Sequence, residues 1–402
     1  MRSRHETGPE TRNVLLLAAC QALFWSALMI GITMSGLVGQ MLADHRALAT
    51  LPAGILAIVT IGVTRPASQF MQRFGRRAGF LVGAAAGLLG GMICAAGIFL
   101  ADFVVFCLGN AVLGGYQAIG QYYRLAATDS VALERRGRAV STVMAGGIVA
   151  AIVAPGLSVW SMELFAPVLF AGSFLAVSAL SVLATGLIAA LAEPKPAAPE
   201  QAAESAPGRP MGEILRQPIF IVAIANAGIA HGVMVLVMLA TPLAMVACQY
   251  PVADAAVVIQ WHVLGMFVPS LFSGRLIDRF GAPAMGLAGA AFLAVSAAVA
   301  AAGIDFANFS AALALLGVGW NFMYAAGTTM ITAAHRPEER GRVQGTAEML
   351  IAGIAALAAF ASAGLLNGLG WAAVNVGAAP LLFIAAGLTF WFSRRTSSKA
   401  TV

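Results

Sequence analysis

The feature that most constrains this chain is a series of about a dozen long apolar stretches separated by short polar connections. As an α-helix, each stretch is long enough to cross the roughly 30 Å hydrocarbon core of a bilayer. Only 10% of the 402 residues are charged, whereas about a quarter are charged in soluble proteins. Backbone polar groups in a membrane must be satisfied within the segment itself, so these stretches should be helices. We therefore predict an all-α polytopic membrane protein and no enzyme.

Twelve transmembrane spans are expected, six on each side of a polar segment. That segment, residues 193–210, reads EPKPAAPEQAAESAPGRP and is typical of a flexible linker. We predict an N-terminal six-helix domain over 1–192, a cytoplasmic linker over 193–216 and a C-terminal six-helix domain over 217–402. The expected spans are 13–41, 47–71, 78–100, 103–126, 139–162, 165–192, 217–247, 253–275, 281–303, 306–330, 343–369 and 371–393.

The two halves repeat short motifs at equivalent places. The tripeptide Arg-Phe-Gly after the second span, at 73–75, recurs after the eighth span at 279–281. The sequence ERRGR at 134–138 recurs as EERGR at 338–342. Because both pairs are separated by a similar number of residues, we predict a parallel repeat of two six-helix units.

The basic residues set the expected orientation. With the N-terminus inside, all of the 23 Lys and Arg except Arg46 fall in cytoplasmic ends and loops. The first apolar run is longer than a signal-peptide core, so no cleavable leader is expected. We predict a monomer in the inner membrane of a bacterial cell, with both termini cytoplasmic. Its environment is the lipid bilayer, and the net charge of +6 reflects topology and not nucleic-acid binding.

One cytoplasmic loop resembles the signature of a known family. The pattern Gly-x-x-x-Asp-Arg-x-Gly is intact at Gly274, Asp278, Arg279 and Gly281. It is similar to the gating loop of the major facilitator superfamily, and a degraded copy stands in the first half. Over essentially the whole chain, this resemblance implies two six-helix domains that rock about a central cavity. Spans 1, 4, 7 and 10 would line that cavity.

Two departures from that family bear on mechanism. Asn110 in span 4 occupies a position where many proton-coupled members carry Arg. The run Ala154-Pro155-Gly156 in span 5 matches the antiporter Gly-Pro motif only in part. Both features weaken a reading as a drug/proton antiporter.

A helical hairpin in the second half carries soft metal ligands. Met234 and Met238 share one face of span 7, and His262 and Met266 share one face of span 8. If the chain folds back near Tyr250, Met238 lies level with His262, and Met234 level with Met266. Thioether sulfur together with imidazole nitrogen suits Cu(I) better than a hard cation. Such neutral ligands release an ion readily, which favours transport over storage.

These two motifs resemble those of the CcoA-type copper importers within the superfamily. That resemblance implies copper as transported substrate, with Met234, Met238, His262 and Met266 as ligands, no cofactor, and a role in assembly of cbb3-type cytochrome oxidase. His231 precedes Met234 by three residues on the same helical stripe. We include His231 as a possible further ligand on spacing alone.

Aromatic and amide side chains at membrane depth keep another substrate open. Their helical spacing places members of each span on shared faces, where they either line the cavity or pack between helices. Such groups suit a flat organic molecule, so an organic-solute importer such as a riboflavin importer is the first alternative. The candidates are Gln21 and Trp25 in span 1, Tyr116, Gln117, Gln121 and Tyr122 in span 4, and Trp320, Asn321 and Tyr324 in span 10.

Charged residues at the inner ends of spans suggest gating. We expect inter-domain ion pairs there, and Glu348 in span 11 is the candidate for a proton relay. A proton-coupled exporter of drugs or metal and a non-transporting membrane sensor are the remaining alternatives. The expected ion-pair residues are Arg124, Asp129, Glu134, Arg135, Arg138, Glu338, Arg340 and Arg342.

Overall fold

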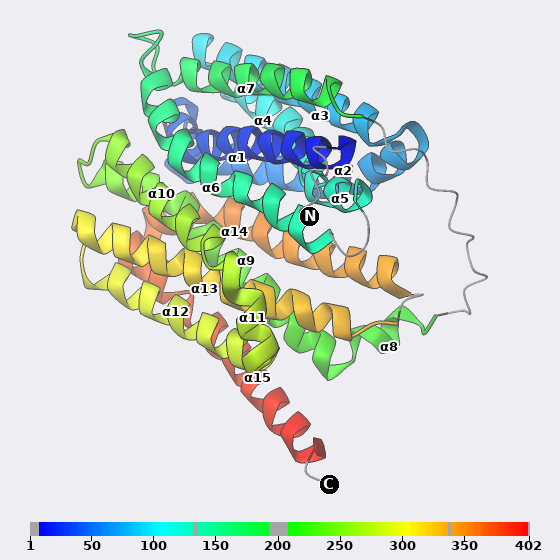
Figure 1. The fold of residues 1–402 in the computed structure, drawn as a ribbon. Coiled ribbons are helices and arrows are strands. Elements are labelled where there is room, and N and C mark those ends of the chain that lie inside the picture. Colours follow the sequence, from blue (N-terminus) through cyan, green and yellow to red (C-terminus); the bar gives the residue numbers. More distant parts are fainter. Residues whose placement is uncertain (1–7, 132–135, 193–207, 337–338, 401–402) are drawn as a thin grey trace, which may run out of the picture. The chain divides into compact units, whose positions relative to one another are not determined.

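The structure is a computed structural model that describes residues 8–131, 136–192, 208–336 and 339–400. These residues form helices joined by loops, and the helices separate into two compact units. Unit 1 comprises Met1–His45 and Leu51–Ala198, and unit 2 comprises Arg46–Thr50 and Pro199–Val402. Figure 1 shows the order of the elements along the chain. The predicted all-α fold is confirmed.

Unit 1 contains seven helices among its described residues. The third helix packs closely against its neighbours on either side in the unit, because small residues allow close approach. Gly90, Gly97 and Gly109 mark the contact between the third and fourth helices, since an added methyl group at each would overlap the other helix. The helices are α1 (Pro9–Leu42), α2 (Leu51–Phe74), α3 (Arg76–Phe99), α4 (Phe103–Gly120), α5 (Tyr123–Asp129), α6 (Arg136–Met162) and α7 (Ala171–Ala189).

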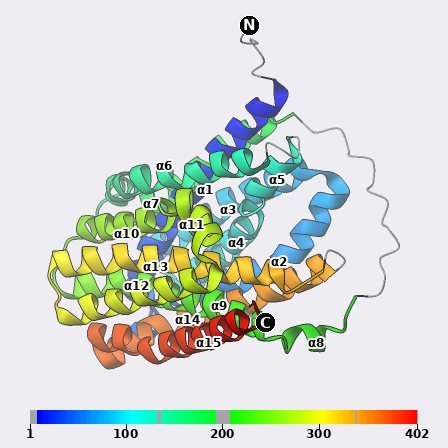
Figure 2. The same cartoon turned by 60° about the horizontal axis from the view of Figure 1, so that its bottom comes forward.

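Unit 2 begins with a short turn and a short helix, followed by long helices. In Figures 1 and 2, α12 and α13 run side by side, and they form the most extensive helix pair of the unit. The elements are η1 (Arg46–Leu48), α8 (Met211–Leu215), α9 (Pro218–Ala247), α10 (Val252–Phe267), α11 (Ser270–Phe280), α12 (Ala282–Ala302), α13 (Phe306–Ala333), α14 (Arg340–Val376) and α15 (Ala379–Ala400).

Ten helical stretches of the described chain are long and apolar enough to cross a membrane. The pair α10 and α11 is an eleventh candidate, bent by 41° at a break that contains Pro269. Proline removes a backbone donor and commonly kinks a helix, which explains the bend. The last stretch, Arg342–Arg395, has 54 residues and holds both α14 and α15. Counting α14 and α15 as separate spans raises the number of candidates to twelve, in agreement with the predicted number of spans.

The repeated motifs adopt matching local conformations. Gly75 has φ 90° and Gly281 has φ 84°, and each ends one helix and begins the next. This region of backbone space favours glycine, which explains why both motifs end in Gly. The preceding arginine stacks over the neighbouring phenylalanine ring in both units, at 5.2 Å from the ring centroid each time. The sequence repeat is therefore also a structural repeat.

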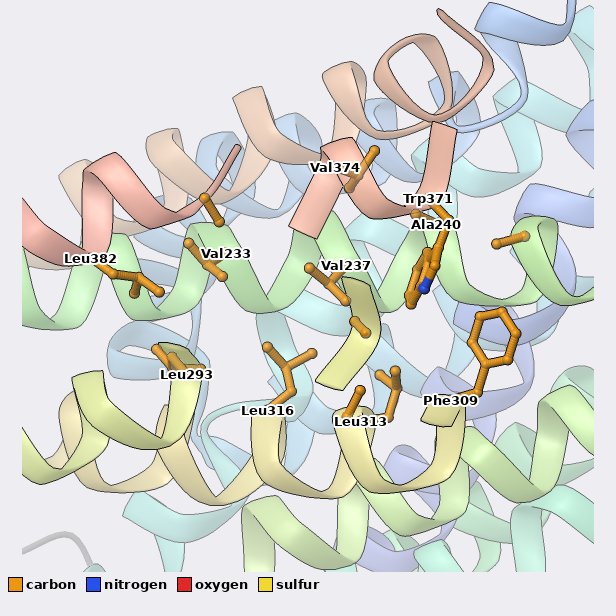
Figure 3. Close-up of a cluster of buried hydrophobic side chains, with 14 of the residues drawn as sticks. Val233, Val237, Ala240, Leu293, Phe309, Leu313, Leu316, Trp371, Val374 and Leu382 are labelled. Atoms are coloured by element: carbon orange, nitrogen blue, oxygen red, sulfur yellow. The ribbon is translucent and has the colours of Figure 1, made fainter. Parts of the chain in front are cut away.

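The core of unit 2 lies between α9, α12 and α13, with the last part of α14. Figure 3 shows Val233 and Val237 of α9 facing Leu316 of α13. The rings of Phe309 and Trp371 close one end of this cluster, 5.0 Å apart. Burial of these side chains fixes α9 against α13, and those two helices carry the site described next.

Candidate functional site

An aromatic cluster lies between α9 and α13 at membrane depth. The indole Nε1 of Trp320 donates a hydrogen bond to Nδ1 of His231 at 3.1 Å. The ring of Tyr324 stacks on Trp320, with centroids 4.9 Å apart and an interplanar angle of 16°. The His231 ring lies 6.0 Å from Trp320 and 5.7 Å from Tyr324. Three rings from two helices therefore form one contiguous surface.

Helix geometry and core packing hold this cluster in place. Trp320 and Tyr324 are four residues apart, so they lie on one face of α13. Trp320 packs against the buried cluster that contains Val233 and Val237, and Tyr324 packs against a second buried cluster. Gly327 allows α9 and α13 to approach closely, because an added methyl group there would overlap the backbone of α9. These contacts with the core hold the rings of Trp320 and Tyr324 in place.

All three rings of the cluster remain partly exposed. A partly exposed aromatic surface with a polar edge can stack on a flat organic molecule and donate or accept hydrogen bonds at its rim. His231, predicted from spacing as a further metal ligand, accepts a hydrogen bond from Trp320 at Nδ1. The sequence placed Trp320 and Tyr324 on one face, and the structure adds His231 from another helix.

The methionine and histidine set of the predicted hairpin is buried. Met234, Met238 and Met266 are exposed by 3%, 6% and 4%, and His262 is fully buried. The helix that packs most extensively against α10 is α13, and α9 contacts α10 much less. That Met238 lies at the same depth as His262, and Met234 at the same depth as Met266, stays a prediction.

The polar atoms of α10 engage α13. Nδ1 of His262 donates to the carbonyl oxygen of Leu313 at 3.0 Å, because a carbonyl can only accept. Asn321 donates through Nδ2 to the carbonyl oxygen of Met266 at 2.8 Å. Asn321 is buried, so it joins two helices and contributes little to an accessible surface. Within the described residues, no group of three or more His, Cys, Asp or Glu is placed to hold a metal ion.

Some of the predicted cavity residues of unit 1 are buried, and others are partly exposed. Gln21 and Tyr116 are each only 4% exposed, while Trp25 and Gln117 are partly exposed. The ring of Tyr116 lies edge-on to Phe24, at 5.3 Å between centroids, and faces α3 and α7. Tyr116 is therefore a core residue of this unit.

Other polar residues of unit 1 occupy the same region. The side-chain oxygens of Gln21 and Gln117 have no hydrogen-bond partner in the described part of the chain. Gln121 is exposed, and Tyr122 donates through its hydroxyl to the carbonyl oxygen of Thr64 at 3.0 Å. Asn110 is fully buried and accepts a hydrogen bond from Ser35 at 3.1 Å. These contacts join helices within unit 1.

The predicted gating loop lies on α11 and at its end. Gly274, Asp278 and Arg279 are on this amphipathic helix, and Gly281 begins α12. Glu348, the predicted proton relay, is exposed on α14.

Only part of the predicted ion-pair set can be placed. Asp129 pairs with Arg76 of the same unit, with Nη2 and Oδ2 3.0 Å apart. Arg124 and Arg342 are exposed. The predicted pairs that involve Glu134, Arg135, Glu338 and the side chains of Arg138 and Arg340 fall outside the described residues.

The sequence analysis missed a buried carboxylate in unit 2. Glu339 is 1% exposed and pairs with Arg209, with Nη2 and Oε2 2.7 Å apart. It also accepts from the backbone N–H groups of Arg209 and Arg336. The Arg209 guanidinium, followed by these backbone donors, holds the pKa of Glu339 well below its ordinary value of 4.5. The repeated motif could have drawn attention to Glu339, because ERRGR in the first half carries Arg135 at the position where EERGR in the second half carries Glu339.

Comparison with known proteins agrees with this architecture. The family model of the major facilitator superfamily matches residues 229–402. The riboflavin transporter RfnT of Brucella anthropi is 43% identical over 364 residues, which cover 90% of this chain and 91% of that protein. The MFS-type transporter YdeG of Bacillus subtilis is 28% identical, over 85% of this chain and 82% of that protein.

Solved structures show the same fold at low sequence identity. A bacterial homologue of the lysosomal transporter Spinster, inward-facing and unoccupied, superposes with a TM-score of 0.73 at 15% identity. That match covers 97% of this chain and 98% of the other. The nucleoside transporter NupG also gives 0.73 at 15% identity, over 95% of this chain and 99% of NupG.

The fold and these relatives define a multi-pass membrane transporter. The chain belongs to the major facilitator superfamily, as the sequence resemblance implied. The finer resemblance to CcoA-type copper importers is not supported. The relative with 43% identity is a riboflavin transporter, and this favours the organic-solute alternative over copper import. The Met-x-x-x-Met and His-x-x-x-Met spacings have another explanation, because thioethers also fill irregular gaps in buried helices.

Proposed function

We propose that this chain imports riboflavin, or a closely related flavin, by alternating access. The observation that carries the proposal is the 43% identity to a riboflavin transporter over 90% of the chain. The aromatic cluster supplies a chemical reason, since a flavin has a large planar ring system with polar atoms at its rim. Stacking of a planar ring on an aromatic side chain contributes about 1–3 kcal/mol.

Trp320 is the proposed principal stacking residue, and Tyr324 supports it by stacking on one face of the indole. Their near-parallel stack presents two aromatic faces from one helix, and the Trp320 indole is fixed at its edge by His231. A surface that is rigid before binding loses little conformational freedom when the solute arrives. The distribution of basic residues supports a bacterial inner membrane location with both termini cytoplasmic.

The test is uptake of radiolabelled riboflavin by liposomes that contain the purified chain. We expect uptake above that of empty liposomes, competition by unlabelled riboflavin, and no accumulation of copper under the same conditions. Absence of riboflavin uptake by a folded, inserted wild-type protein would overturn the proposal. Copper uptake that is lost in a Met234→Leu/Met238→Leu variant would instead reinstate the metal-import alternative.

A further inference from the structure

The hydrogen bond between Trp320 and His231 determines where the imidazole of His231 carries its proton. An indole N–H can only donate, so Nδ1 of His231 must accept. A neutral imidazole that accepts at Nδ1 carries its hydrogen on Nε2. Both the other tautomer and the doubly protonated ring would place two N–H groups against each other. Trp320 therefore selects the neutral Nε2–H form of His231.

The resulting Nε2–H group is available to a ligand. His231 is partly exposed, and Nε2 has no hydrogen-bond partner within the described part of the chain. His262 contrasts with it, because its ring is fully buried and its Nδ1 donates to Leu313 of the neighbouring helix. Of these two membrane-depth histidines, only His231 offers a hydrogen-bond donor beside an accessible aromatic surface.

The position of His231 suits the rim of a stacked solute. Its ring centroid lies about as far from Tyr324 as from Trp320, at 5.7 and 6.0 Å, and is tilted by 42° and 44° to their planes. A planar molecule stacked on the outer face of Trp320 would lie beside the imidazole, because His231 is hydrogen-bonded to the edge of that indole. The isoalloxazine ring of a flavin carries several acceptors at that edge, including N1, N5 and two carbonyl oxygens.

We propose that His231 donates a hydrogen bond from Nε2–H to a rim acceptor of the bound flavin, and that Trp320 is the positioning residue that fixes this tautomer. This inference rests on the proposed function for the identity of the solute. It adds a specificity rule: the site requires an acceptor on the ring system at the point that His231 reaches.

Two substitutions at residue 231 separate donor geometry from packing. The amide nitrogen of Gln in His231→Gln can take the place of Nε2, whereas the shorter amide in His231→Asn can take only that of Nδ1. We expect KM for riboflavin to rise about tenfold in His231→Asn, with kcat nearly unchanged, because a single hydrogen bond made equally in ground and transition states is lost. In His231→Gln, KM should stay within about threefold of wild type.

Flavin analogues identify the acceptor. In 5-deazariboflavin and 1-deazariboflavin a ring nitrogen is replaced by C–H, at N5 and N1 respectively. If one of these nitrogens accepts from His231, that analogue should bind wild type about tenfold more weakly than riboflavin. The His231→Asn variant should bind riboflavin and that analogue equally. If a carbonyl oxygen accepts, neither analogue should discriminate, and the contrast between His231→Asn and His231→Gln carries the test.

The tautomer itself is measured without any flavin. Nitrogen-15 NMR of the full-length chain labelled at histidine should show an Nε2–H signal for His231, assigned by its loss in His231→Gln. Trp320→Phe keeps a ring but removes the donor, so both neutral tautomers of His231 should be populated in this variant. An Nδ1–H form in the wild type would overturn the inference.

The outcomes distinguish this inference from the proposed function. If the wild type fails to bind riboflavin, the proposed function falls and the inference with it. If the wild type binds riboflavin but His231→Asn and His231→Gln behave alike, only the inference is overturned.

Discussion

Two regions of unit 2 contain similar residue types at similar depth but differ in accessibility. The aromatic cluster of His231, Trp320 and Tyr324 is partly exposed and joined by a hydrogen bond and a ring stack. The methionine and histidine set of the hairpin is at least 94% buried at every member, the largest exposure being 6% for Met238. His231 and Met234 are only three residues apart, yet their environments differ. Residue spacing alone therefore does not say which side of a membrane helix a solute can reach.

The polar atoms of the two regions also have different partners. In the hairpin set, Nδ1 of His262 donates to the backbone of α13, so one edge of that ring is used for helix packing. In the aromatic cluster, the bond between Trp320 and His231 joins two side chains and leaves Nε2–H accessible. A partly exposed side-chain pair of this kind keeps a polar edge that a solute can bind, whereas a fully buried contact mainly stabilises the unit.

The largest expected effect comes from removing the stacking surface. Trp320→Ala should lower kcat/KM for riboflavin by about 100-fold, because it removes both the stack and the donor that positions His231. Initial uptake rates in liposomes measure this. Trp160→Ala is the matched control, since Trp160 is 65% exposed on α6 of unit 1 and the cluster belongs to unit 2. Equal rates in the two variants would refute a substrate role for the aromatic cluster.

A methyl group added at a helix contact should selectively disturb the buried methionine and histidine set. In Gly317→Ala, the added methyl group would overlap the carbonyl oxygen of His262, which is part of the helix and cannot rotate away. We expect a loss of about 1–3 kcal/mol in stability, seen as a lower midpoint of thermal unfolding in detergent. Gly353→Ala serves as control, since nothing lies within 4 Å of the new atom. An unchanged midpoint would contradict the close packing of α10 on α13.

A substitution remote from both regions tests whether lost stability alone explains lost transport. Glu339→Gln removes the carboxylate that pairs with Arg209 and should lower the unfolding midpoint at pH 7. The pKa of Glu339 is depressed in the folded state, so its contribution is complete above the unfolded value of 4.5. That contribution is lost as the pH falls below 4.5 toward the folded-state pKa.

Thermal scans of wild type and Glu339→Gln at pH 7, 5.5 and 4 measure this dependence. The gap between the two midpoints should be similar at pH 7 and 5.5 and smaller at pH 4. A gap that grows on acidification would have the wrong sign for a depressed carboxyl pKa. Riboflavin KM should be unchanged at pH 7, since Glu339 contacts neither region.

The smallest expected effect is at the methionines. Met234→Leu/Met238→Leu conserves volume in a buried site and removes both thioethers, so riboflavin uptake should stay within about twofold of wild type. Uptake assays with riboflavin and with radioactive copper, run on the same liposomes, measure the effect. A severe loss of riboflavin uptake would show that these buried positions take part in the transport site, and would remove the contrast between the two regions.

Much of the fold could be predicted from sequence because membrane insertion is a strong local constraint. Long uncharged stretches have few alternatives to a helix in lipid, and the expected boundary at residue 370 coincides with Gly370, whose φ of 82° interrupts α14. The bend at Pro269 was missed, since span 8 was read as one segment. The pairing of Glu339 with Arg209 was missed because these residues are 130 positions apart and meet only in the folded unit.

The sequence by itself determined the membrane class, the helical repeat, and the glycines at 75 and 281, because hydrophobicity and backbone conformation are properties of short segments. Only the tertiary structure decided which intramembrane polar groups are accessible. Rotation of a helix about its axis depends on what packs against it, and α9 is fixed by the burial of Val233 and Val237 against α13. That packing buries Met234 and leaves His231 partly exposed beside Trp320, so the same helix both fills the core and presents the proposed site.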